Sequence, residues 1–167
     1  MLTLFAVSIF PLLMVYASLS DALTMLIPNK ISILLVGVFL ALAMVSGMPM
    51  QDVGRHFLCG FFILACTFTL FLMRLIGGGD AKLCAAVALW MGFGNLVEFL
   101  FLTTLIGAGI AILLIALRKI PLPPKLRLAP LLQWVGETRS VPYGIAIAAS
   151  GLYFYMQTPI WSALVAM

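Results

Sequence analysis

The segment from Gly77 to Met91 reads GGGDAKLCAAVALWM: three glycines, an ionisable carboxylate at Asp80, and then an apolar run. The glycines predict a turn, because glycine adopts backbone conformations that other residues avoid. The run after Asp80 predicts a membrane-spanning helix, which places the acid at the mouth of a span. Carboxylates in or beside spans are costly and by default functional. Asp80 is therefore a candidate functional residue, and the alternative is that the segment is only a tight turn.

The composition of the chain indicates a membrane protein. Of the 167 residues, 65% are hydrophobic and 8% are charged, whereas soluble domains are roughly 45–50% apolar. A crossing of about 30 Å of hydrocarbon needs about 20 apolar residues. We predict an all-α, polytopic protein with a single membrane-embedded domain over residues 1–167. Its six transmembrane helices are expected at about 2–19, 31–48, 57–76, 81–97, 99–117 and 141–158.

The boundary between the fourth and fifth spans is set by a cluster of turn residues. The stretch from Leu83 to Leu117 is too long for one crossing. Gly92, Gly94, Asn95 and Glu98 therefore mark a turn within it. A helix that continues to Val97 is the alternative.

The basic residues predict the orientation, because Lys and Arg accumulate in cytoplasmic loops. With six spans, one side of the membrane receives only Arg55, and the other receives Lys30, Arg74, Lys82, Arg118, Lys119, Lys125, Arg127 and Arg139. Both termini are then external, and residues 118–140 form a basic cytoplasmic loop that either lies in the interface or is solvated. The net charge of +4 indicates contact with anionic lipids and not with nucleic acid.

The first apolar run is expected to be retained. No Lys or Arg precedes residues 2–19, so the basic region of a cleaved signal peptide is missing. We expect no appended soluble domain.

The acidic residues offer one partner for Asp80. On the predicted topology Asp52 and Glu98 are external, and Glu137 lies in the polar part of the basic loop. Asp21 remains, at the cytoplasmic edge of the first span. Two carboxylates in a partly desolvated site share one proton, which is the chemistry of aspartic proteases. Asp21 alone would instead be read as an interfacial residue.

Other hydrolytic centres are excluded by the residue inventory. A Ser-His dyad or an H-E-x-x-H zinc site needs histidine. The only histidine is His56, expected as an interfacial residue on the external side. Cys59, Cys66 and Cys84 lie in predicted spans and are expected to be small apolar residues. We expect no metal and no cofactor.

Three motifs together resemble a known family. They are Asp21 followed by Ile27-Pro28-Asn29, the segment from Gly77 to Leu83, and Val141-Pro142-Tyr143-Gly144 at the start of the last span. Their order and span positions are similar to those of the type IV prepilin peptidases, a branch of the G-x-G-D intramembrane aspartic proteases. The resemblance implies that Asp21 and Asp80 are catalytic and that Gly77 and Gly79 are the motif glycines. Gly78, Lys82, Pro28 and Asn29 complete the set expected next to the substrate.

The resemblance also implies a function. The family removes the leader peptide from prepilins and pseudopilins at the cytoplasmic face of the bacterial inner membrane, just before the hydrophobic segment. The expected partners are these substrates, membrane lipids and the pilus assembly machinery. The chain is similar to the short peptidases of tight-adherence (Flp-type) pilus systems. It lacks the C-x-x-C region of the bifunctional members, so no methyltransferase activity is expected.

Two other functions remain open at this point. The first is a small transporter or channel subunit in which Asp21 and Asp80 bind a proton or cation. The second is a non-catalytic subunit of a pilus or secretion assembly. The spans carry few polar residues and both acids lie at one edge, which favours a protease over a transporter. A non-catalytic relative would be expected to lose one acid, and both are present.

Overall fold

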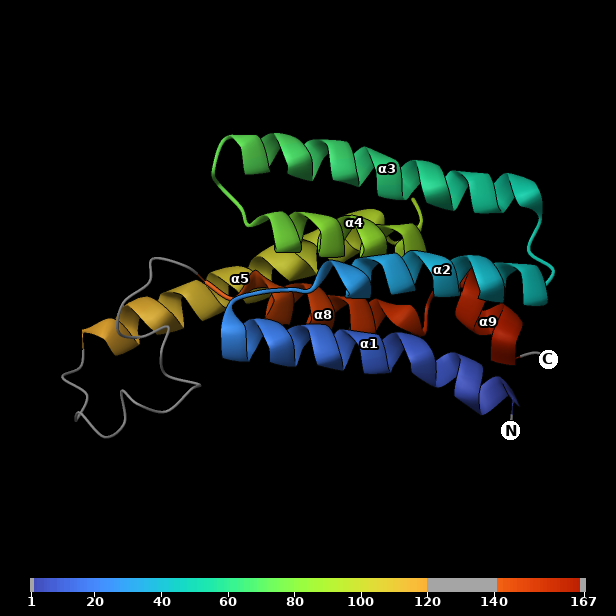
Figure 1. Cartoon of the computed structure of the whole chain (residues 1–167), viewed down its shortest axis with the longest axis horizontal. Coiled ribbons are helices and arrows are strands. Elements are labelled where there is room, and N and C mark those ends of the chain that lie inside the picture. Colours follow the sequence, from blue (N-terminus) through green and yellow to red (C-terminus); the bar gives the residue numbers. More distant parts are fainter. Residues whose placement is uncertain (1, 120–140, 166–167) are drawn as a thin grey trace.

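The computed structural model describes residues 2–119 and 141–165, and these residues form helices joined by short turns, with no strand among them (Figure 1). Three helices, α1, α3 and α5, are long and apolar enough to cross a membrane by length and composition. The elements are α1 (Leu2–Thr24), α2 (Asn29–Val45), α3 (Met50–Leu72), α4 (Gly78–Met91), α5 (Leu96–Arg118), α8 (Tyr143–Tyr155) and α9 (Pro159–Val165).

Proline and glycine set most of the helix boundaries. Pro28, Pro49 and Pro142 stand directly before α2, α3 and α8. Proline suits the start of a helix, where its missing N–H is not needed, and is costly in the interior. Gly92 ends α4 with φ +63°, a conformation that glycine adopts without steric cost.

A helix covers each of the six predicted segments, but some boundaries differ. α1 continues past residue 19 to Thr24, so Asp21 lies inside a helix and not after it. α4 ends at Met91 and not at 97, and the turn falls at Gly92–Asn95. In the last segment α8 ends at Tyr155 and not at 158, and a separate short helix, α9, follows beyond that segment. The crossing of the membrane by six helices and its orientation stay predictions, and most of the basic loop lies outside the described residues.

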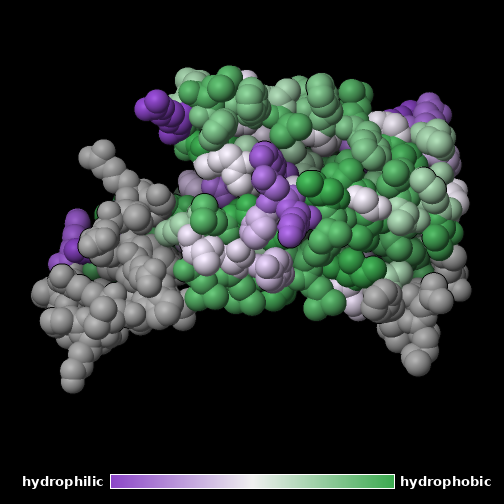
Figure 2. Space-filling view, viewed as in Figure 1, coloured by the Kyte–Doolittle hydropathy of each residue, from purple (hydrophilic) through white to green (hydrophobic). Residues whose placement is uncertain are grey.

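The short helix α4 forms the centre of the bundle. Its residues from Leu83 to Met91 are all buried, and it packs on α2, α3, α5 and α8. An aromatic cluster of Phe10, Phe39, Trp90 and Tyr155 lies beside its end. Large apolar side chains of the other helices face outward (Figure 2), as expected for a surface covered by lipid.

The helices alternate in direction, so the turns gather at two ends. One end, here called the aspartate end, holds residues 25–28, residues 73–77 and the start of α8. The opposite end holds the α2–α3, α4–α5 and α8–α9 turns. Among the described residues, Lys30, Arg74, Lys82, Arg118 and Lys119 lie toward the aspartate end, and Arg55 lies toward the other. This distribution matches the charge asymmetry on which the predicted orientation rests.

Candidate functional site

Asp21 lies in the last turns of α1 and is almost fully buried, with 4% of its surface exposed. Its Oδ2 accepts a hydrogen bond of 2.7 Å from the backbone N–H of Gly144. Gly144 belongs to the first turn of α8, where backbone N–H groups have no partner within the helix. The positive end of the α8 dipole therefore also faces the carboxylate, which favours its charged form.

Gly144 has no space for a side chain. A Cβ atom there would lie 2.7 Å from Oδ2 of Asp21 and 2.9 Å from Cδ1 of Ile27. Distances this short do not occur between real atoms of these types. The glycine therefore permits the hydrogen bond that holds Asp21.

Asp80 lies in the first turn of α4, three residues after the N-cap residue Gly77. The backbone of Gly77 donates a hydrogen bond to the Asp80 carboxylate. A side chain at this position that reaches back to the N-cap N–H forms one half of a capping box. The start of α4 thus holds the Asp80 side chain in place, and the helix dipole there favours a negative charge on it.

The three motif glycines meet three different neighbours. A Cβ on Gly77 would lie 2.8 Å from Oδ2 of Asp80, and one on Gly78 would lie 3.2 Å from the Phe71 ring. A Cβ on Gly79 would lie 3.2 Å from Cβ of Ile27. The glycines therefore do more than form a turn, because each allows a close approach at the start of α4.

The turn between α1 and α2 packs Ile27 against the starts of α4 and α8. The hydroxyls of Ser20 and Thr24 donate to the carbonyl of Leu26, at 2.8 and 3.2 Å, and Met25 takes a positive φ of 54°. This reverses the chain and brings Ile27 against Gly79 of α4 and Gly144 of α8. One side chain therefore touches the helix that carries Asp80 and the helix whose backbone N–H binds Asp21.

The two carboxylates are close enough to repel each other electrostatically. Two carboxylates that repel each other in a partly desolvated site are able to share one proton. Each carboxylate also faces the N-terminus of a helix, which favours retaining one negative charge. The arrangement is suited to one acid that donates a proton and one base that accepts a proton.

The remaining residues predicted next to the substrate lie at the same end. Pro28 caps the start of α2, and Asn29 begins it. The Lys82 ammonium group donates a hydrogen bond of 3.0 Å to Oδ1 of Asn29. The structure therefore places all eight predicted residues, from three separate stretches of sequence, around the starts of α2 and α4 and the end of α1.

Sequence reasoning assigned no role to Gly144 or Ile27. Both occur in the quoted motifs, but nothing in the order of residues shows that α8 begins against Asp21. The available signal was the pair of motifs Ile27-Pro28-Asn29 and Val141-Pro142-Tyr143-Gly144. Their glycine and isoleucine meet only when α1, α4 and α8 pack together.

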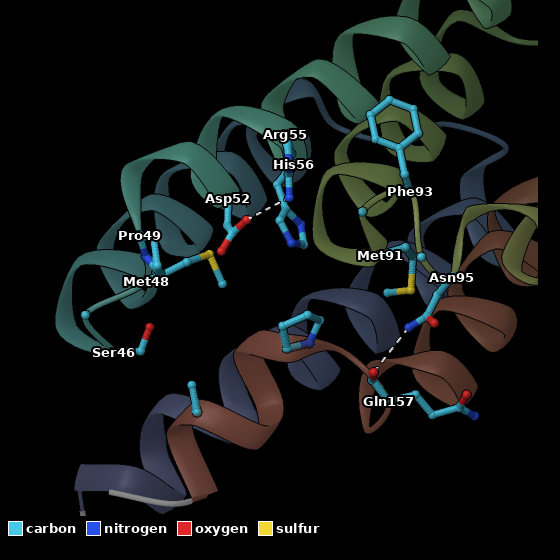
Figure 3. Close-up of a pocket in the computed structure, with 15 residues that line it drawn as sticks. Ser46, Met48, Pro49, Asp52, Arg55, His56, Met91, Phe93, Asn95 and Gln157 are labelled. Atoms are coloured by element: carbon cyan, nitrogen blue, oxygen red, sulfur yellow. Dashed lines mark hydrogen bonds and ion pairs between the residues drawn. The ribbon is translucent and has the colours of Figure 1, made fainter.

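A hollow of about 610 Å³ lies at the end opposite the aspartates and is lined by residues of the three turns there (Figure 3). Arg55 pairs with Asp52 at 3.4 Å on the exposed surface. His56 was expected at the interface, but this was wrong: it is buried. Its Nδ1 donates to the carbonyl of Leu89 at 2.7 Å, and its ring packs against Gly92. His56 thus joins α3 to α4, away from the aspartates.

Comparison with known proteins identifies a family. A sequence model described as "Type IV leader peptidase family" matches residues 8–112, a range that includes Asp21 and Asp80. No curated protein and no solved structure matches the chain.

Proposed function

The chain belongs to the type IV leader peptidase family, and we propose that it is an intramembrane aspartic endopeptidase with Asp21 and Asp80 as the catalytic pair. We propose as its substrates type IV prepilins of the Flp kind and pseudopilins, whose leader peptides it removes. The proposed place is the cytoplasmic face of the bacterial inner membrane. The family match supports a protease of the leader peptidase type, and the finer assignments rest on the site and on the motif resemblance.

The observation that carries the proposal is the meeting of two acids from distant parts of the chain. Asp21 comes from the end of α1 and Asp80 from the start of α4, and they interact electrostatically. A backbone N–H holds each carboxylate. Burying carboxylates costs free energy, and two carboxylates that are nevertheless held in place here support a catalytic role.

The pair supports hydrolysis of a peptide bond by general acid–base catalysis. The ionised carboxylate takes a proton from a water molecule, whose oxygen attacks the scissile carbonyl. The protonated carboxyl donates a hydrogen bond to the carbonyl oxygen and afterwards helps to protonate the leaving amine. The proton taken from water replaces the one that is donated, so the pair returns to one shared proton. The two acids titrate as a unit, so neither role is assigned to one residue.

The location at the cytoplasmic face is supported by charge. The described basic residues other than Arg55 lie toward the aspartate end, and basic residues accumulate on the cytoplasmic side of membranes. The three long apolar helices support a multi-pass membrane protein. No described feature favours a transporter, because both acids lie at one end of the bundle.

The test is co-expression of the chain with an Flp-type prepilin. Leader removal is followed by mobility shift, and mass spectrometry locates the cut. We expect cleavage by the wild type and none by Asp80→Asn, which keeps the side-chain shape but removes the ionisable carboxyl. The control is Glu98→Gln, which removes an exposed acid at the opposite end and should leave cleavage intact. Processing that survives in Asp80→Asn would contradict the aspartic mechanism.

A further inference from the structure

A groove on the outside of the bundle begins at the aspartate end, near the starts of α2 and α4. α2 and α3 form its two walls and both pack on α4, which forms its floor. In Figure 1, α4 lies between α3 and α2. The groove has a volume of about 560 Å³ and an apolar lining, except for Ser32 and for Asn29 and Lys82 at one end. Figure 2 shows hydrophilic side chains in the middle of this face, between α3 and α2, with hydrophobic side chains on both sides of them.

The shape of the groove fits a helix. Its floor is lined from Lys82 to Leu89, which is about 10 Å along α4, or two helical turns. The floor carries the small residues Ala85 and Ala86, and the walls carry Ile33 and Phe61, each 70% exposed. Small residues let helices approach closely in membranes, where contact depends on packing. A helix seated here would touch the alanines between two larger side chains.

The polar end of the groove lies at the aspartate end of the bundle. Lys82 lies two positions after Asp80, and its ammonium group contacts Asn29 at the start of α2. An extended peptide in a membrane needs partners for its backbone groups, since lipid supplies none. The Asn29 amide donates and accepts, and the Lys82 ammonium donates. These two groups therefore match a stretch of non-helical backbone between the groove and the acids.

We propose that this groove binds the first two helical turns of the substrate's apolar segment. The residues directly before that helix then lie extended across Asp21 and Asp80, with Asn29 and Lys82 beside their backbone. The inference rests on the proposed function, because the leader substrates are cut just before an apolar segment. It adds the direction of binding: the substrate helix begins at the aspartate end, parallel to α2 and α4 and antiparallel to α3.

Site-specific photo-crosslinking tests the placement. A benzophenone amino acid replaces Ile33 or Phe61 in the Asp80→Asn variant, so that uncut prepilin accumulates. The control position is Ile112 on α5, which is 68% exposed and does not line the groove. We expect crosslinks from both groove positions to the first two turns of the prepilin's apolar segment, and none from position 112. Adducts with lipid alone at positions 33 and 61, or equal prepilin crosslinks at position 112, would overturn the proposal.

Cleavage kinetics separate this inference from the proposed function. Ile33→Trp should raise KM about fivefold with kcat nearly unchanged, because it removes binding that is uniform along the reaction. Ile112→Trp, at an equally exposed isoleucine, should match the wild type. If the wild type cleaves prepilin but the two tryptophan variants behave alike, the groove assignment is wrong and the proposed function stands. If the wild type cleaves no prepilin, both are wrong.

Discussion

The close packing of Gly144 against Asp21 predicts that Gly144→Ala impairs the chemical step. The added Cβ would lie 2.7 Å from Oδ2 and 2.9 Å from Cβ of Asp21, so the carboxylate has to turn away. It then loses the 2.7 Å hydrogen bond from the backbone N–H. The change is one methyl group, at a position that carries no catalytic side chain itself.

The expected size of the effect follows from that bond. A hydrogen bond to a charged group contributes about 1.5–3 kcal/mol. Because about 1.36 kcal/mol in the activation barrier is a factor of ten in rate, the loss is about tenfold to about hundredfold in kcat. KM should change little, since no residue of α8 lines the proposed substrate groove. The net result is a folded enzyme that binds its substrate and cleaves it slowly.

The assay is the initial rate of leader removal by purified enzyme, followed by gel densitometry at several prepilin concentrations. Gly109→Ala is the matched control, because a Cβ there meets nothing within 4 Å. Melting temperatures of both variants report whether folding is intact. A Gly144→Ala enzyme that folds and cleaves at the wild-type rate would refute the idea that this glycine positions Asp21.

Three further predictions test separate parts of the structure. Gly60→Ala should lower the melting temperature by an amount equivalent to about 1–3 kcal/mol through overpacking, because its Cβ would lie 2.8 Å from a side chain of α4. Gly54→Ala on the same helix meets nothing and should not lower it; equal thermal shifts would contradict the α3–α4 packing. Asn29→Ala and Lys82→Met should each reduce kcat/KM and show a coupling of about 1 kcal/mol in a double-mutant cycle, and additive losses would show that their contact has no role. His56→Ala should lower the free energy of unfolding by about 1–3 kcal/mol, since it leaves a buried carbonyl unpaired. The kcat per folded enzyme should not change, and a selective loss of kcat would place His56 in the catalytic machinery.

The apolar runs, and the proline and glycine residues between them, made the helices predictable. Runs without charge predict buried or lipid-facing helices, and proline or glycine marks where they stop. The observed helices follow this pattern, and the family indicated by the three motifs is confirmed. The extension of α1 through Asp21 was missed, because the end of an apolar run was taken as the end of the helix. In the structure the helix continues until Met25 takes a positive φ.

The contacts that build the site were beyond prediction from sequence. Elimination among five acids could pair Asp21 with Asp80, but it could not show what holds either one. The holding groups are backbone N–H groups of Gly77 and Gly144, and a backbone donor carries no signature in the side-chain pattern. The burial of His56 was missed for a related reason: its partner is a backbone carbonyl on another helix.

The central claim is that Asp21 and Asp80 act as one catalytic unit, and a double-mutant comparison of single-turnover rates tests it most directly. The enzymes are the wild type, Asp21→Asn, Asp80→Asn and the double variant, each with the same prepilin. Residues that act as a unit give non-additive losses. We predict that each single variant loses essentially all cleavage and that the double variant is no worse than either one. Substantial cleavage by either single variant, or losses that multiply in the double variant, would contradict the account.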